Sequence, residues 1–162
     1  EHDIGPMVGA RLVAKAWIDP AFRQRLLEDA DGVVADEGVR GAEIEHIEVK
    51  ANEPGVHNVV VCTLCSCYPW ALLGLPPNWY KSPEYRARIV REPRRVLDEM
   101  GLALDSETEV RVWDSSSETR FLVLPERPVG TEGWTEDALA ELVSRDAMIG
   151  VARANDPAEA GS

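Results

Sequence analysis

The sequence lacks the features that mark membrane-spanning, secreted and disulfide-stabilised proteins. No apolar run in its 162 residues approaches the about 20 residues that a membrane-spanning helix requires, and no signal-peptide pattern opens it. Cysteine is scarce, and all three cysteines lie within residues 62–67, which makes a structural disulfide framework implausible. We therefore expect a cytoplasmic protein that does not bind a membrane.

Positive charge is also in short supply. Lys and Arg number 17 against 29 Asp and Glu, which gives a net charge of −12 and a pI near 4.7. Proteins that bind nucleic acid carry basic patches that contact the phosphates, so this composition argues against a nucleic-acid partner. An arginine cluster at residues 91–95 has acidic residues within and after it, and we interpret it as a solvated helix face.

The length and the order of the predicted elements indicate one domain of the α+β class. A chain of this size buries about 70% of its unfolded surface, enough for a sizeable core. We predict an N-terminal helical segment over residues 1–40, which forms one domain with an α/β core over residues 41–151. Residues 152–162 are rich in Ala, Asp, Pro, Glu, Gly and Ser, and we predict a disordered tail there.

Apolar spacing and capping signals predict two helices near the N-terminus. Residues 8–18 have the apolar period of a helix. Asp19 and Pro20 then read as the N-cap and first turn of a second helix, which we expect to end near Gly38 or Gly41. The apolar stripes of these helices could dock a partner, but packing in the chain's own core is the favoured interpretation.

Further helices are predicted after the cysteines. Ser82-Pro83 begins a helix that runs through Arg91, Glu92-Pro93 interrupts it, and a second segment continues to Met100. Thr135 caps a last helix with acidic residues in its first turn.

Four segments have the composition of β-strands. Residues 47–51 alternate between apolar and charged side chains, and residues 57–61 are strongly β-prone and lead directly into the cysteines. Residues 109–114 and 119–124 are two further strands, joined by a short Ser-rich segment, and a hairpin is the simplest arrangement for them.

The run Cys62–Cys67 (Cys-Thr-Leu-Cys-Ser-Cys) has the spacing of a chelating metal site. Between Cys65 and Cys67 lie the backbone nitrogens of Ser66 and of Cys67 itself. If both nitrogens were deprotonated, sulfur, nitrogen, nitrogen and sulfur could surround one ion in a plane. Cys62 could fold back as an axial ligand, and one octahedral position would stay open for water or substrate, as a catalytic metal site requires.

The charge of this ligand set favours a trivalent ion. Three thiolates and two amidates are strongly negative together, and peptide nitrogens ionise only beside a strong Lewis acid. Co(III) or Fe(III) therefore fits better than Zn(II), which prefers four sulfur and nitrogen ligands without amidates. A zinc site of three Cys and His57 is conceivable, but a strand histidine that hydrogen-bonds a neighbour or faces a partner is the favoured interpretation.

The run Cys62–Cys67 resembles the metal-binding motif of the nitrile hydratase α subunit and of the related thiocyanate hydrolase γ subunit. The resemblance covers roughly residues 9–150. Its other matching segments are residues 56–61, 68–70, 74–77, 111–114, 123–128 and 148–150. It implies the layered α/β fold of those subunits.

The resemblance also implies a cofactor, a modification and a partner. Threonine after the first cysteine goes with the cobalt type of that family, so Thr63 implies non-corrin Co(III) in preference to iron. Cys65 would be oxidised to sulfinate and Cys67 to sulfenate, with Cys62 left as thiolate. A β subunit would supply arginines that stabilise the oxidised sulfurs, in a heterodimer or α2β2 assembly. Family members carry an N-terminal extension, most of which would be absent from a chain that begins at Glu1.

Two residues outside the metal motif are candidates for a substrate pocket. Trp70 closely follows the motif, where the family has an aromatic residue. Glu43 stands where many family members have glutamine near the active site, although a surface glutamate is an equally good interpretation. The aromatic residues Tyr68, Trp79 and Tyr80 could also line a cleft, but core positions are favoured for them.

The function that this sequence predicts is the hydration of a small nitrile to the corresponding amide. The catalytic residues would be Cys67, Cys65 and Ser66, and the metal ligands would be Cys62, Cys65, Ser66 and Cys67. A metallochaperone is a possible further partner. The alternatives are a thiocyanate hydrolase γ-type subunit, or a non-catalytic chain that carries metal or binds zinc in an interaction module.

Overall fold

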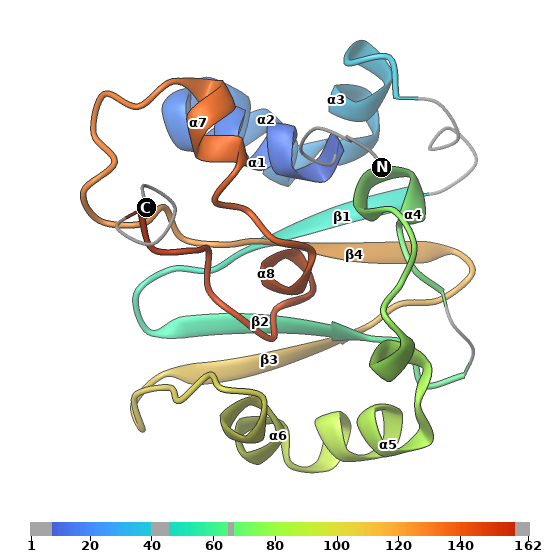
Figure 1. Ribbon diagram of the computed structural model, residues 1–162. Coiled ribbons are helices and arrows are strands. Elements are labelled where there is room, and N and C mark those ends of the chain that lie inside the picture. The colour runs from blue at the N-terminus through green and yellow to red at the C-terminus, as the bar shows by residue number, and fades with distance from the viewer. Residues whose placement is uncertain (1–7, 40–45, 65–66, 158–162) are drawn as a thin grey trace.

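Four strands form two parallel pairs, and helices cover both pairs (Figure 1). The computed structural model describes residues 8–39, 46–64 and 67–157. Strand β1 (His46–Ala51) pairs with β4 (Thr119–Leu124), and β2 (Val56–Val61) pairs with β3 (Glu109–Asp114). Helices α1 (Val8–Ile18), α2 (Pro20–Glu28), α3 (Ala30–Asp36) and α7 (Glu136–Ala140) lie over the β1–β4 pair. Helices α5 (Pro83–Arg91) and α6 (Pro93–Glu99) lie beyond β3, and α8 (Arg145–Ile149) packs across the face where β4 and β2 adjoin.

The predicted hairpin between β3 and β4 is wrong, although the bounds of both strands are those predicted from the sequence. β2 is buried almost throughout, and β3 pairs with its backbone groups, which would be costly to bury unpaired. The Ser115 N–H extends this pairing by donating to Val61 O (2.6 Å). The chain then turns at Ser116, whose N–H donates to Thr119 O (2.8 Å), and crosses to the other pair. Parallel pairing partners are distant in sequence, so no local pattern reveals them.

The N-terminal helices pack into the core, as expected. They are α1 (Val8–Ile18), α2 (Pro20–Glu28) and α3 (Ala30–Asp36). On α1, Leu12, Val13 and Ala16 are at most 4% exposed, so the apolar stripe faces the chain's own core. Asp19 caps α2 as predicted, with its Oδ1 accepting from the N–H of Ala21 at 3.0 Å.

The second predicted helix is interrupted by Asp29. Its backbone leaves the helical region (φ −149°, ψ 69°), and its carboxylate accepts from Gly32 N at 3.0 Å. Aspartate favours such caps because its short side chain competes for nearby backbone N–H groups. One predicted helix is therefore two, and α3 begins at Ala30.

Among the described residues, six helices follow the cysteines. They are α4 (Trp70–Leu73), the 3-10 helix η1 (Asn78–Lys81), α5 (Pro83–Arg91), α6 (Pro93–Glu99), α7 (Glu136–Ala140) and α8 (Arg145–Ile149). Of these, α5 and α6 lie along β3, whereas α4 and α7 pack against α1. The predicted cap at Ser82 and the break at Glu92 are both present. The predicted cap at Thr135 begins α7, which ends at Ala140, and Ser144 caps a further short helix, α8, that was not predicted (Ala147 N to Ser144 Oγ, 3.0 Å). Beyond α8, the Asn155 N–H donates to Leu142 O at 2.8 Å.

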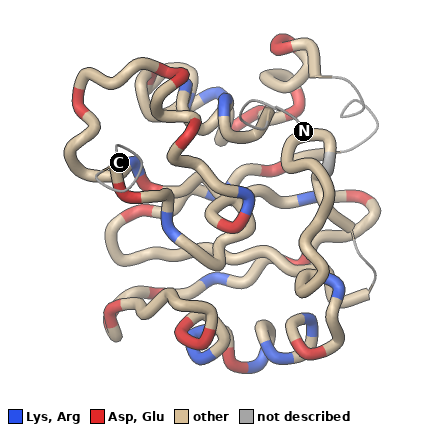
Figure 2. Tube along the Cα trace, viewed as in Figure 1, with Lys and Arg blue, Asp and Glu red and all other residues tan. Residues whose placement is uncertain are grey.

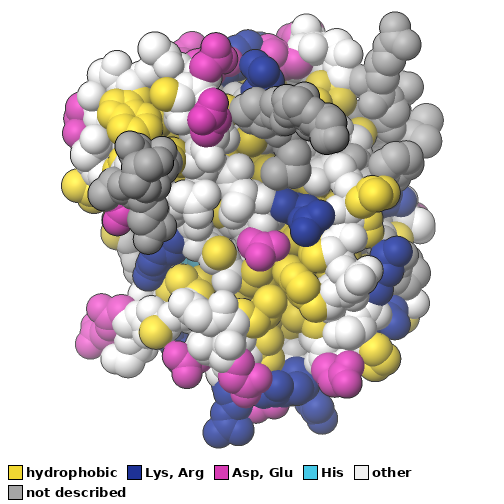
Figure 3. Space-filling model, viewed as in Figure 1, with side chains coloured by type: hydrophobic (Ala, Val, Ile, Leu, Met, Phe, Trp, Pro, Cys, Tyr) yellow, Lys and Arg dark blue, Asp and Glu magenta, His cyan; other side chains and the backbone are white. Residues whose placement is uncertain are grey.

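Charged side chains are spread over the surface. Lys and Arg follow α5 and α6 along one edge, with acidic residues between them (Figure 2). Arg88 pairs with Glu92 and Glu99 (2.9 and 2.8 Å), as expected for a solvated helix face. On the face drawn in Figure 3, hydrophobic side chains gather between α8 and α5. Every helix in the described part of the chain is too short or too polar to cross a membrane.

Gly150 allows α8 to approach β2 closely. Its φ of 105° disfavours a side chain, and a Cβ there would lie 2.3 Å from Asn58 O and 2.7 Å from Val59 Cα. Gly101 has a similar φ of 99° but open space around it. We expect Gly150→Ala to lower the free energy of unfolding by about 2 kcal/mol more than Gly101→Ala does. Both variants strain the backbone, but only the Cβ at position 150 would also clash with backbone atoms of β2. Urea denaturation of both variants measures this difference, and equal losses would contradict the close packing.

Candidate metal centre

Two of the three cysteine side chains are buried inside the molecule, and the end of β2 places the first of them. Cys62 directly follows the strand and is completely buried, and Cys67 is 8% exposed. The preceding residues Val59, Val60 and Val61 are at most 2% exposed, so a strand held on both faces carries the first cysteine. Buried thiols are soft sulfur donors, and the one that directly follows a rigid strand is held in a fixed position, which suits a transition-metal ion.

The first turn of the cysteine loop is hydrogen-bonded to the end of β3. Asp114, the last residue of β3, accepts from the Thr63 N–H (2.9 Å) and from the Thr63 hydroxyl (2.7 Å). Asp114 stands opposite Val61 in the parallel register, which places its carboxylate beside the loop. The sequence did not single out Asp114 as a site residue. Only the pairing of β2 with β3 reveals its role.

The last residues of the loop are held from two other elements. The Tyr80 phenol on η1 donates to Cys67 O (3.1 Å), and an Arg120 Nη on β4 donates to Tyr68 O (3.1 Å). Both carbonyl groups therefore have partners. The loop is thus anchored at its beginning by β3 and at its end by η1 and β4.

An aromatic cluster lies on the buried side of the loop. The rings of Tyr68 and Tyr80 meet edge to face at 5.1 Å, and Trp79 meets Tyr85 at 4.9 Å. Burial raises the pKa of the Tyr80 phenol, as does the nearby Cys62, so it stays a neutral donor. The three tyrosines are at most 5% exposed and form core rather than the wall of an open cleft. Within the described residues, the Tyr68 hydroxyl has no hydrogen-bond partner.

Several predicted site residues lie outside the described residues. These are Cys65, Ser66 and Glu43, and so is the side chain of Trp70, whose backbone begins α4. Among residues 8–39, 46–64 and 67–157, no three His, Cys, Asp or Glu side chains are placed to hold a metal ion. The predicted ligand set therefore stays a prediction, of which the structure describes Cys62 and Cys67.

His57 has a structural role at the opposite end of β2. Its Nε2 donates to Gly150 O (2.6 Å), and its Nδ1 faces the Asn52 amide at 3.3 Å. Both ring nitrogens are thus engaged, and five residues of strand separate His57 from Cys62 by roughly 16 Å. The favoured interpretation of a strand histidine that hydrogen-bonds its neighbours is confirmed.

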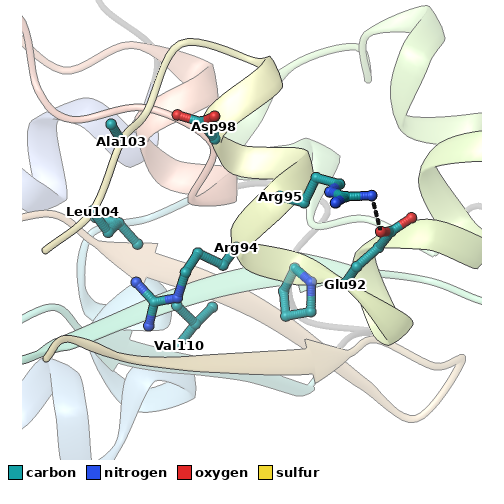
Figure 4. A pocket seen from close by; sticks show the side chains of 8 residues that line it. Glu92, Arg94, Arg95, Asp98, Ala103, Leu104 and Val110 are labelled. Atoms are coloured by element: carbon teal, nitrogen blue, oxygen red, sulfur yellow. Dashed lines mark ion pairs between the residues drawn. The ribbon is translucent and has the colours of Figure 1, made fainter. Parts of the chain in front are cut away.

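A pocket of about 830 Å³ lies between α6 and β3, away from the cysteines (Figure 4). Arg95 pairs with Glu92 at its rim (3.6 Å). The guanidinium of Arg94 donates to the backbone carbonyls of Asp105 and Thr108. These contacts are local, and the residues that line the pocket lie on α6, on the segment after it and on β3 rather than in the cysteine loop.

Comparisons with known proteins agree with the resemblance and with the predicted α+β fold. The family model described as nitrile hydratase, alpha chain, matches residues 1–152. The low-molecular weight cobalt-containing nitrile hydratase subunit alpha of Rhodococcus rhodochrous is 56% identical over 160 residues, 99% of this chain and 77% of that protein. A structure of the Fe-type nitrile hydratase from Comamonas testosteroni Ni1 matches with a TM-score of 0.89 at 47% identity, over 96% of this chain and 76% of that chain.

A second activity occurs among the relatives. The thiocyanate hydrolase subunit gamma of Thiobacillus thioparus is 50% identical over 164 residues, which cover 93% of this chain and 67% of that protein. The same scaffold therefore serves proteins named for two different substrates.

Burial lowers the pKa of His57 below its ordinary value of 6.5, so its neutral form stabilises the fold. As the pH falls, the His57 imidazole is therefore protonated in the unfolded chain at a higher pH than in the folded protein. We therefore expect wild-type protein to lose stability relative to His57→Gln as the pH falls below about 6.5. Urea titrations at several pH values measure the difference between the two proteins.

His46 does not confuse this comparison. Its hydrogen bonds to Asp31 and Glu48 raise its pKa, so it stabilises the fold below pH 6.5 and loses this effect as the pH rises. This contribution is present in both proteins and cancels. Parallel stability curves for wild type and His57→Gln would show that His57 is not buried in its neutral form.

Proposed function

The chain belongs to the nitrile hydratase alpha-chain family, and from this membership we propose that it is the metal-binding subunit of an enzyme that hydrates a small nitrile to the amide. The observation that carries the proposal is sequence identity. The chain is 56% and 53% identical, over 99% of its own length, to two alpha subunits named as cobalt-containing nitrile hydratases. The reaction adds the oxygen of water to the nitrile carbon, while protons pass to the nitrogen.

The proposed ligands are the sulfurs of Cys62, Cys65 and Cys67 and the backbone nitrogens of Ser66 and Cys67. The donor chemistry fits Co(III): the thiols are soft, the two described ones are buried, and Cys62 directly follows a rigid strand. Thr63 favours cobalt over iron by resemblance. When bound, Co(III) would act as a Lewis acid that polarises the nitrile or lowers the pKa of water.

The chain's own residues fix the geometry and move protons. Asp114 orients the beginning of the loop through both of its bonds to Thr63. Cys67, as sulfenate, is the candidate nucleophile or general base, because its oxygen would lie beside the reacting carbon. Cys65, as sulfinate, would add acceptor oxygens, and the Ser66 hydroxyl would hydrogen-bond within the site. The buried aromatic cluster excludes water from the inner side of the loop.

The site is completed by a second chain in this proposal. Leu64, in the middle of the cysteine loop, is 89% exposed, so its side chain is open to contact by another chain. A β subunit would bring the cationic donors that stabilise oxidised sulfurs, in a heterodimer or an α2β2 assembly. Trp70 and Glu43 are our candidates for this chain's share of the substrate pocket.

Thiocyanate hydrolysis is the second candidate function. It is favoured by the similarity to a thiocyanate hydrolase gamma subunit, but that protein is less identical to this chain than the cobalt nitrile hydratase subunits are. Incubating the assembled enzyme with nitriles and with thiocyanate separates the two functions. Amide as the main product supports nitrile hydratase, and carbonyl sulfide with ammonia supports thiocyanate hydrolase.

The direct test is metal analysis combined with the mass of the peptide that contains residues 62–67. We expect near-stoichiometric cobalt and a mass increase of three oxygens, two for a sulfinate and one for a sulfenate. Zinc with unmodified thiols and no gain of activity with a β subunit would contradict the proposal and favour a non-catalytic metal-binding chain.

Replacing a ligand residue should remove metal and activity together. We expect Cys65→Ala and Cys67→Ala to lower cobalt content and turnover each by more than about tenfold, since each variant loses a sulfur ligand. The matched control is Leu64→Ala, which changes an exposed side chain in the same loop and should keep its cobalt. A Cys67→Ala variant with full activity would rule out the proposed ligand set.

A further inference from the structure

The phenol of Tyr80 lies directly beneath the cysteine loop. Tyr80 is completely buried on η1, and its hydroxyl donates to Cys67 O at 3.1 Å. Cys67 is only 8% exposed, so its carbonyl has little access to water as an alternative partner. A buried carbonyl that loses its donor is destabilised, and its residue tends to move.

The position of this phenol is fixed by its neighbours. The Tyr80 ring packs edge to face on Tyr68 (5.1 Å) and Trp79 (6.2 Å), and it is tilted against Tyr85 at 5.9 Å. The backbone of η1 adds a further constraint, since Tyr80 N donates to Pro77 O at 3.1 Å. Because the Tyr80 hydroxyl is fixed in this way, it can restrain the Cys67 carbonyl to which it donates.

A second tyrosine makes a similar bond, but outside the cysteine loop. The Tyr85 hydroxyl donates to Val60 O at 2.8 Å, and Tyr85 is 5% exposed. Val60 lies within β2, where the pairing with β3 already fixes the backbone. Tyr80 and Tyr85 therefore form a matched pair, in which one phenol holds the loop and the other holds the strand.

We propose that Tyr80 is a positioning residue for the metal centre, which acts by holding the carbonyl group of Cys67. This inference rests on the proposed function. The carbonyl carbon is one bond from Cys67 Cα, which carries both the backbone nitrogen and the side chain. Holding the carbonyl restrains Cα and so narrows the positions that the two donor atoms of Cys67 can take. Ligand positions must hold to within about 0.5 Å for a productive site, and the bond from Tyr80 restrains Cys67 toward that tolerance.

The experiment compares Tyr80→Phe with Tyr85→Phe in the complex with the β subunit, produced with cobalt. Each variant removes one hydroxyl from a buried ring and leaves one carbonyl short of a donor. We expect similar losses of melting temperature in the two variants. Only Tyr80→Phe should lower cobalt content and kcat, each by about tenfold, the effect of removing an outer partner of a metal ligand.

Readouts other than activity separate positioning from a general loss of stability. In Tyr80→Phe, the peptide of residues 62–67 should carry a mixture of oxidation states by mass, and the sulfur-to-cobalt absorption band should shift. KM should stay within about twofold of wild type, because the change affects the metal centre rather than substrate binding. Tyr85→Phe should match wild type in all three measurements.

Three outcomes would overturn the inference. Tyr80→Phe with wild-type cobalt, oxidation and absorption would show that the bond does not position the centre. Equal losses of cobalt in both variants would show that the tyrosines act only through stability. Wild-type protein without cobalt would instead overturn the proposed function, and this inference with it.

Discussion

The burial of β2 is the constraint on which the rest of the structure depends. Its last three residues are almost inaccessible to water, so their backbone groups need partners within the protein. β3 supplies them in parallel register, and this pairing brings Asp114 opposite Val61. The strand is therefore followed by Cys62 in a fixed position, and the Asp114 carboxylate accepts from the N–H of the next residue, Thr63.

The other end of β2 is held by a network of buried polar groups. The Asn58 N–H donates to Asn52 Oδ1 (2.7 Å), and Trp113 Nε1 on β3 donates to Asn58 Oδ1 (2.8 Å). His57 adds the bond to Gly150 O, which ties α8 to the strand. Satisfied polar networks of this kind specify one arrangement of their neighbours. They fix the direction of β2, and β2 carries the cysteines.

Capping residues and residue composition predicted most helices and strands, because both act through residues that are close in sequence. Asp19, Ser82 and Thr135 accept from the N–H groups of the helices that follow them, and the bounds of β3 and β4 agree with their composition. The break at Asp29 was missed, although capping by aspartate is itself a local signal.

What the sequence could not supply was the pairing of distant segments. The pairing of β2 with β3 is decided by tertiary packing. The contacts of Asp114 and Tyr80 with the cysteine loop also depend on tertiary packing. The cysteine run was recognised from its spacing and its resemblance, which are properties of the sequence. Its supporting residues come from other elements, and no spacing rule connects them.

The sequence separation of the supporting contacts has a consequence for the order of events during synthesis. Thr63 is bonded to a residue 51 positions later, and Tyr68 to one 52 positions later. Closing such long segments costs entropy that only the finished strand pairs repay. In a nascent chain whose cysteines have just left the ribosome, the cysteine loop therefore has not yet folded. In the metal centre that we propose, the ligand geometry would become available only after β4 has emerged, so metal loading would be a late step that follows the pairing of all four strands.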